Sequence, residues 1–278
     1  MTTRTTKLSI RKLSAIALAT AAPFAAQAQT ASDGWQWQAA MYGYFPALGG
    51  TTQFPSGAAG PAIDISSDTL IDHLKFAFMA TLSAKKGQWG FWTDVFYTDV
   101  GGSKSGTREF EIAGQPLPAD VNGNFSLDVK TTLWTLAGTY ELGKSSTYSL
   151  DLLAGTRLAD MNQNLDWTIN GDISGIPLPG RSGTKTLDIT NWDAIVGVKG
   201  MAYIGSGQKW FLPYYVDVGA GQSKLTWQFN AGIGYQFGWG ALVASWRYID
   251  YEMKSDVPIQ SLTFNGPLNA LLKALGLI

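Results

Sequence analysis

The sequence predicts an all-β protein: an up-and-down antiparallel transmembrane β-barrel of about ten strands, with short periplasmic turns and longer external loops. Three observations predict this fold class. The chain begins with an export signal, its later segments alternate apolar and polar residues with a period of two, and the connections between those segments alternate in length. No later segment has the roughly 18 uninterrupted apolar residues that predict a spanning helix.

The composition excludes several classes of function. The chain has 278 residues, of which 15% are charged, with one histidine and no cysteine. Disulfide scaffolds, thiolate metal sites and cysteine nucleophiles are therefore excluded, as are sites with several histidine ligands. A net charge of −1 gives no signal for nucleic-acid binding. P-loop, dinucleotide, calcium-loop and nucleophile-elbow motifs are absent, so we expect no enzyme activity, no cofactor, no metal and no nucleic-acid partner.

Residues 1–28 have the pattern of a secretory signal peptide. Four basic residues precede an apolar run, Leu13 to Phe24, and Ala26-Gln27-Ala28 supplies a small–x–small cleavage site. The run falls short of the roughly 20 residues that span a membrane. We therefore expect residues 29–278 to form one outer-membrane domain, reached by export across the inner membrane of a Gram-negative cell.

The clearest strand signal lies in Leu225–Phe237. Leucine, aromatic residues, alanine and isoleucine occupy one face of this segment, while threonine, glutamine, asparagine and glycine occupy the other. Thirteen residues of strict alternation exceed a typical globular strand but fit a tilted membrane strand. We expect the outer face to contact lipid and the polar face to line the lumen. The lipid-facing residues are Trp227, Phe229, Ile233, Tyr235 and Phe237, and the inward ones are Gln228, Asn230 and Gln236.

The same alternation justifies the other expected strands. From the N-terminus, the first five are Trp35–Phe45, Lys75–Lys85 through Phe76 and Phe78, Trp89–Val100 through Trp89 and Val95, Ser126–Tyr140 through Leu127, Val129, Leu133 and Ala137, and Tyr148–Asp160 through Leu150 and Leu152. The later ones are Asn191–Ile204 through Trp192 and Val196, Trp210–Val218 through Leu212 and Val216, Leu225–Phe237, Ala241–Met253 through Leu242 and Trp246, and Ser261–Leu268. An even count of ten places both termini at the same end of the barrel.

Connection lengths and tryptophan positions support the barrel. Short turns are expected at 86–88, 143–147, 205–209 and 238–240, and longer loops at 48–74, 101–125, 161–190 and 254–260, with 219–224 as a short exception. Trp89, Trp210 and Trp239 lie on or beside short turns, where amphipathic rings favour the headgroup level. The alternative is a secreted soluble β-sandwich binding protein, which would bury the same apolar face against a second sheet.

Ten charged residues are expected on the inward face. The acids are Asp94, Asp128, Asp151, Asp193 and Asp217, and the bases are Lys75, Lys130, Arg157, Lys199 and Arg247. Charges in so narrow a lumen are costly unless they are paired. One interpretation is a packed network that stiffens a structural barrel. The other is a narrow, hydrated, porin-like passive channel that selects ions or polar solutes.

The segment Asp64–Leu74 suggests a further feature at the outer rim. Its Ser/Asp cap candidates and the spacing of its leucines predict a short helix across the barrel mouth. Asp72-His73 at its end is the motif of an alternative function, a barrel-borne hydrolase in which His73 and carboxylates activate water. A lone histidine beside a loop acid is more often a solvated surface residue.

Several segments resemble a family of uncharacterised proteobacterial outer-membrane β-barrel proteins. They are Phe76–Trp89, Ser149–Arg157, Leu225–Phe237, Trp246–Tyr251, Asn265-Gly266-Pro267 and Asp64–Leu74. The resemblance implies a barrel, outer-membrane lipid and the barrel assembly machinery as partners, and no established activity or catalytic residues. One departure is the C-terminus: such barrels usually end on Phe, whereas Leu268–Ile278 has helix-forming content and no aromatic residue. Either the last strand is unusual or this tail is a short amphipathic helix.

Overall fold

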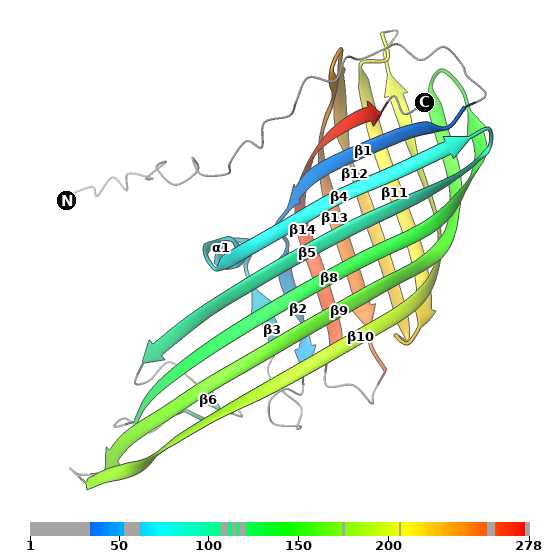
Figure 1. Ribbon diagram of the computed structural model, residues 1–278. Coiled ribbons are helices and arrows are strands. Elements are labelled where there is room, and N and C mark those ends of the chain that lie inside the picture. Colours follow the sequence, from blue (N-terminus) through cyan, green and yellow to red (C-terminus); the bar gives the residue numbers. More distant parts are fainter. Residues whose placement is uncertain are drawn as a thin grey trace, which may run out of the picture.

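Ten long antiparallel strands close into a barrel in the computed structural model of the chain (Figure 1). The structure describes residues 34–52, 62–106, 111–112, 115–116, 121–173, 176–205, 207–254 and 259–275. The expected signal peptide, residues 1–28, lies outside the described residues. No helix among the described residues is long and apolar enough to cross a membrane.

The barrel strands follow one another in chain order around the wall. They are β1 (Gln36–Tyr44), β4 (Leu74–Lys86), β5 (Trp89–Gly106), β8 (Val121–Lys144), β9 (Tyr148–Ile173), β10 (Ile176–Ile204), β11 (Trp210–Gly221), β12 (Leu225–Phe237), β13 (Gly240–Glu252) and β14 (Ile259–Leu275). Pairing of β14 with β1 closes the wall, and the ten expected strands are thereby confirmed. We call the end that carries the connections β4–β5, β8–β9, β10–β11 and β12–β13 the turn end, and the opposite end the loop end.

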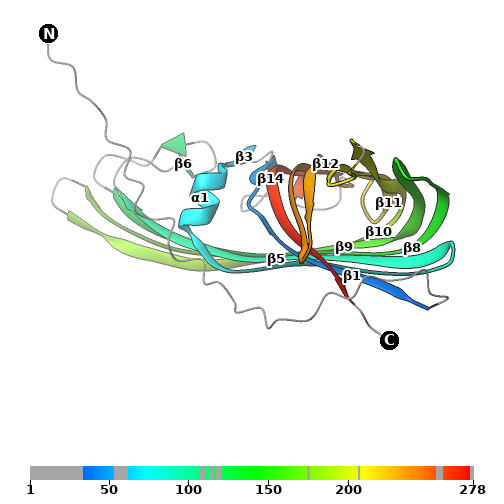
Figure 2. The same ribbon diagram turned by 90° about the horizontal axis from the view of Figure 1, so that it is seen from above.

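The remaining elements lie in the connections at the loop end. After β1 the chain continues into β2 (Ala47–Thr52), which pairs with β14 and with β3 (Ala62–Ile65). A two-residue ladder joins β6 (Glu111–Ile112) to β7 (Gln115–Pro116). The helix α1 (Ser67–Asp72) confirms the expected short helix, and it lies on the concave side of the sheet formed by β5, β8, β9 and β10 (Figure 2).

Residues 161–190, which were expected to be a loop, are largely strand, as are both ends of the expected loop 101–125. β9 and β10 have 26 and 29 residues, and together with β5 and β8 they extend well beyond the rest of the barrel at the loop end (Figure 1). Polar side chains bridge the two strands: Thr190 donates to Asp160 at 2.6 Å, and Thr186 donates to Asn164 at 2.7 Å. Such cross-strand pairs stabilise the outward face of the hairpin, and these polar outward side chains are why the segment resembled a loop.

The described part of the C-terminal tail, up to Leu275, is strand rather than helix. Leu268 to Leu275 pair with Tyr44 to Trp37 of β1, and the part up to Leu272 also pairs with β13. Hydrogen bonds to strands on both sides override the helix propensity of leucine, alanine and lysine in this segment. The tail therefore supplies the closing seam of the barrel.

Side chains alternate between an exposed apolar outer face and a buried inner face. In β12, Phe229 and Ile233 are exposed on the outside, whereas Thr226 and Gln228 are buried inside. This register confirms the expected division of Leu225–Phe237.

The expected sides of β8 are reversed. Leu133 and Ala137 are buried in the lumen, while Trp134 and Leu136 are exposed on the outside. Apolar residues stand on both faces of this strand, so alternation alone did not distinguish them. Thr135 settles the matter, because it faces Arg157 across the ladder and accepts a hydrogen bond from it inside the barrel.

Candidate functional site

The half of the lumen toward the loop end is filled by an apolar cluster, which we call the plug. Its members come from eight strands and from Met253, just after β13: Tyr44, Met79, Phe96, Leu133, Ala159, Met161, Ile189, Ile249, Tyr251, Met253, Ile259, Leu262, Phe264 and Leu268. Aromatic contacts cross the lumen, because the ring of Phe96 lies 5.6 Å from Tyr44 and 6.1 Å from Phe264. All members are at most 7% exposed, so this half of the barrel is a packed core.

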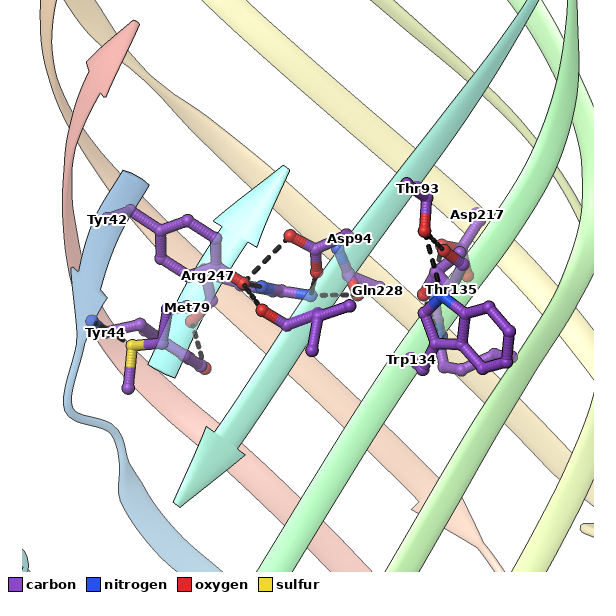
Figure 3. Close-up of polar contacts among 12 residues, drawn as sticks. Tyr42, Tyr44, Met79, Thr93, Asp94, Trp134, Thr135, Asp217, Gln228 and Arg247 are labelled. Carbon is purple, nitrogen blue, oxygen red and sulfur yellow. Dashed lines mark hydrogen bonds and ion pairs between the residues drawn. The ribbon is translucent and has the colours of Figure 1, made fainter. Parts of the chain in front are cut away.

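Below the plug, Arg247 of β13 forms a buried ion pair with Asp94 of β5. Its Nη2 lies 2.7 Å from Asp94 Oδ2, and the two side chains are 3% and 4% exposed. Arg247 also donates to Tyr42 Oη at 3.0 Å and to Gln228 Oε1 at 3.1 Å, and Tyr42 donates to Asp94 at 2.8 Å (Figure 3). These added hydrogen bonds satisfy charges that burial would otherwise make costly.

A second buried ion pair joins Arg157 of β9 to Asp217 of β11, with side chains that are 1% and 0% exposed. Arg157 Nε donates to Thr135 at 3.2 Å. Asp193 lies opposite Arg157 in the β9–β10 register, and it accepts hydrogen bonds from Asn191 at 2.6 Å and from the backbone of Ser223 at 2.9 Å. The two ion pairs and their partners form a polar layer across the middle of the lumen.

The half toward the turn end is hollow. A cavity of about 530 Å³ occupies it, lined by side chains from the plug side down to the turns. Lys85, in the lining of this cavity, forms ion pairs with Glu141 and, at 3.1 Å, with Asp151. Lys199 lies beside Asp151 on the next strand, with Nζ 5.5 Å from the ring centroid of Trp92.

Seven of the ten expected inward charges lie in the lumen: Asp94, Asp151, Asp193, Asp217, Arg157, Lys199 and Arg247. The other three do not. Lys75 and Asp128 pair with each other at 2.5 Å and are 49% and 40% exposed, and Lys130, 4.0 Å from Asp99, is 55% exposed. Asp128 and Lys130 alternate with the inward residues of β8, so the reversal of that strand places them outside.

Several lumen residues were not expected from the sequence. Lys85 and Glu141 lie at the edges of expected strands, and the period of two places Lys85 on the inward face with Thr81 and Ser83. This alternation could have predicted from the sequence that Lys85 faces the lumen. Tyr42 and Thr135 had no comparable signal, because uncharged side chains are common on either face of a barrel strand. Gln228 was expected in the lumen with the polar face of Leu225–Phe237.

The rim motif Asp72-His73 lies at the loop end of the barrel. Asp72 ends α1, and the backbone carbonyl of His73 accepts a hydrogen bond from Gly101 at 3.0 Å. Within the described part of the chain, no group of three or more histidine and acidic side chains is placed to hold a metal ion.

Comparison with known proteins finds similar architectures only. No family model matches the chain, and no curated protein sequence matches it. Among solved structures, it is similar to the outer-membrane protease OmpT from Escherichia coli, with 10% identity, a TM-score of 0.43 and coverage of 86% of this chain and 95% of that one. It is also similar to the translocator domain of the autotransporter NalP from Neisseria meningitidis, with 13% identity, a TM-score of 0.36 and coverage of 86% of this chain and 88% of that one. A mutant of the monoaromatic hydrocarbon channel TodX has 9% identity, a TM-score of 0.30 and coverage of 89% of this chain and 91% of that one. At these identities the likeness concerns the fold alone.

Proposed function

We propose that the chain is an outer-membrane β-barrel with a closed lumen, which has a structural role in the envelope rather than that of an open pore. The observation that carries this proposal is the stack of apolar plug and buried ion pairs inside the barrel. A conducting pore requires a continuous hydrated path, and here packed side chains occupy the loop-end half of the lumen.

The outer face supports residence in a membrane. Trp35, Trp89, Trp210 and Trp239 are exposed at the turn end, and Trp134 and Trp192 are exposed further along the wall with ring centroids 6.2 Å apart. On β12, Tyr235 contacts Trp210, and Trp227, eight residues before Tyr235, stacks on Tyr248. At about 3.3 Å per residue and a tilt of about 40°, the two aromatic rows are roughly 20 Å apart, close to the apolar band of known barrels.

The polar hairpin begins where this band ends. Leu158 lies between Trp134 and Trp192 in the ladder, and the next outward-facing pair toward the loop end is Asp160 with Thr190. Hydrogen-bonded polar side chains suit the headgroup region and the water beyond it, so β9 and β10 are expected to project outside the cell.

Membrane residence is tested by fractionation and by migration in detergent gels. We expect the protein in the outer-membrane fraction, and we expect unboiled and boiled samples to migrate differently because the closed barrel resists unfolding. Identical migration, with protein that remains soluble without detergent, would favour the soluble β-sandwich.

Closure is tested in planar lipid bilayers. The purified barrel is expected to give almost no steady conductance, whereas a narrow channel would give stable conductance with an ion preference set by Lys85, Asp151 and Lys199. Large and stable conductance of the wild-type protein would contradict the closed barrel and support a small porin.

A further inference from the structure

The floor of the turn-end cavity is a continuous row of polar side chains on six neighbouring strands. Direct register partners define the row from β8 to β13: Glu141, Asp151, Lys199, Tyr215, Asn230 and Arg247. All six line the cavity. Because partners across an antiparallel ladder point to the same face, these side chains all point into the lumen, and the tilt of the strands makes the row rise from the turn end at Glu141 toward the middle layer at Arg247.

The charged side chains at the ends of this row form ion pairs, whereas those at its centre do not. Glu141 and Asp151 share Lys85, and Arg247 has Asp94. Lys199 forms no ion pair with any residue that the structure describes, since its neighbour Asp151 is already bound to Lys85. On β12, two strands from Lys199, Asn230 Oδ1 is buried without a hydrogen-bond partner. Ser245 Oγ on β13 is also buried without a partner, and its register partner Gly232 lies two residues nearer the turn end than Asn230. Buried groups of this kind normally have partners.

Aromatic and aliphatic side chains surround these polar groups. Tyr215 lies between Lys199 and Asn230 in the row, and the centroid of its ring is 5.0 Å from that of Trp92. Nearer the turn end, Phe211, Ala241 and Val243 form a second buried cluster, against which Tyr203 and Leu272 pack. The cavity therefore offers flat apolar walls around the ammonium group of Lys199 and the unpartnered polar atoms of Tyr215, Asn230 and Ser245, a combination typical of small-molecule sites.

We propose that this cavity binds a planar aromatic carboxylate that also carries a hydrogen-bond donor. The carboxylate pairs with the ammonium group of Lys199, and the ring lies along Trp92. The donor reaches Asn230, two strand spacings of roughly 4.8 Å away, or Ser245, three spacings away. The ligand enters from the turn end, where the exposed residues Gln36, Gln208 and Gln236 line the cavity. This site does not depend on whether the lumen conducts, because the plug lies beyond it, toward the loop end.

The test is calorimetric titration of the intact, detergent-purified barrel with indole-3-acetate, which has a carboxylate, a flat ring and an indole N–H. Indole-3-acetamide is the matched neutral probe. We expect saturable binding of indole-3-acetate and at least tenfold weaker binding of the amide. Lys199→Met should weaken indole-3-acetate binding at least tenfold, while Lys199→Arg retains much of it. Lys86→Met, which removes an exposed lysine outside the cavity, should leave affinity unchanged and controls for partition into micelles.

Asn230→Leu provides a second variant of almost the same size. It removes an acceptor offered to the indole N–H, so the affinity for indole-3-acetate should fall even if Lys199→Met fails to fold. Heat-modifiable migration verifies that each variant is a closed barrel. Absence of saturable wild-type binding, equal affinity for acid and amide, or affinity unaffected in a folded Lys199→Met variant would each overturn the proposal and leave a cavity that holds only water.

Discussion

Arg157 is almost fully buried, and its one ion-pair partner among the described residues is Asp217. A buried ion pair contributes little net stability relative to an apolar pair, but removal of one partner leaves an uncompensated charge. Asp217→Ala should therefore lower the free energy of unfolding by about 3–5 kcal/mol. Urea unfolding in detergent, followed by tryptophan fluorescence, measures the change.

The pair Lys224–Glu252 is the matched control, because its side chains are 66% and 50% exposed. Lys224→Ala should change the free energy of unfolding by about 0–1 kcal/mol. If both variants lost the same stability, water would have to reach Arg157, and the packed polar layer would be wrong.

Ala231, in the middle of β12, tests the lipid-facing register. It faces outward beside Trp246 of β13, so Ala231→Arg should cost roughly 2–4 kcal/mol in a bilayer. Ala231→Leu at the same position adds bulk without charge and should be nearly neutral. Equal losses, measured by urea unfolding in lipid vesicles, would indicate that this face is packed against protein rather than lipid.

Gly232 illustrates what the pattern of alternation cannot reveal. The sequence places this glycine toward the lumen, where an arginine would be expected to fit. In the structure, a Cβ atom here would overlap the backbone carbonyl of Ala244 and the side chain of Ser245. Gly232→Arg is therefore not a tolerated lumen substitution, and close strand packing explains the glycine.

At the scale of elements, period-two alternation identified all ten barrel strands, because each buries one face and exposes the other. It failed where that contrast is weak. β8 carries Leu133 inside and Trp134 outside, and the outer parts of β9 and β10 are polar on their exposed face. The ion pairs were beyond the pattern altogether: Arg247 and Asp94 are 153 positions apart, and only barrel closure and strand stagger bring them together.

The projecting β9–β10 hairpin should be dispensable for barrel formation. Its side-chain bonds, such as Thr184 to Asp166 at 2.5 Å, join the two strands to each other rather than to the plug. Replacing residues 168–182 by Asn-Gly would connect Trp167 to Gly183, which are register partners, through a favoured hairpin turn. We expect heat-modifiable migration to persist, and its loss would show that the hairpin is needed to fold the wall.

β14 should be indispensable by the same measurement. Deletion of residues 269–278 removes seven of the eight register pairs with β1, which leaves both strand edges open. Unpaired edges in a membrane are strongly unfavourable, so this variant should migrate identically with and without boiling. Deletion of residues 276–278 is the control, because it leaves every recorded β1–β14 pair in place. A folded barrel after the longer deletion would contradict the observed closure.

At the scale of the whole molecule, the lumen is asymmetric: apolar at the loop end, ionic in the middle and hollow at the turn end. The layers make separate contributions, and bilayer conductance can distinguish them. If the plug is the seal, Arg247→Ala alone should remain closed despite its loss of stability, because Tyr44, Phe96 and Phe264 still meet across the lumen. Adding Phe96→Ala and Phe264→Ala should open a path through the plug to the cavity and produce a measurable leak. Each variant must retain heat-modifiable migration for its conductance to count. A leak from Arg247→Ala alone would instead identify the ionic layer, not the plug, as the barrier.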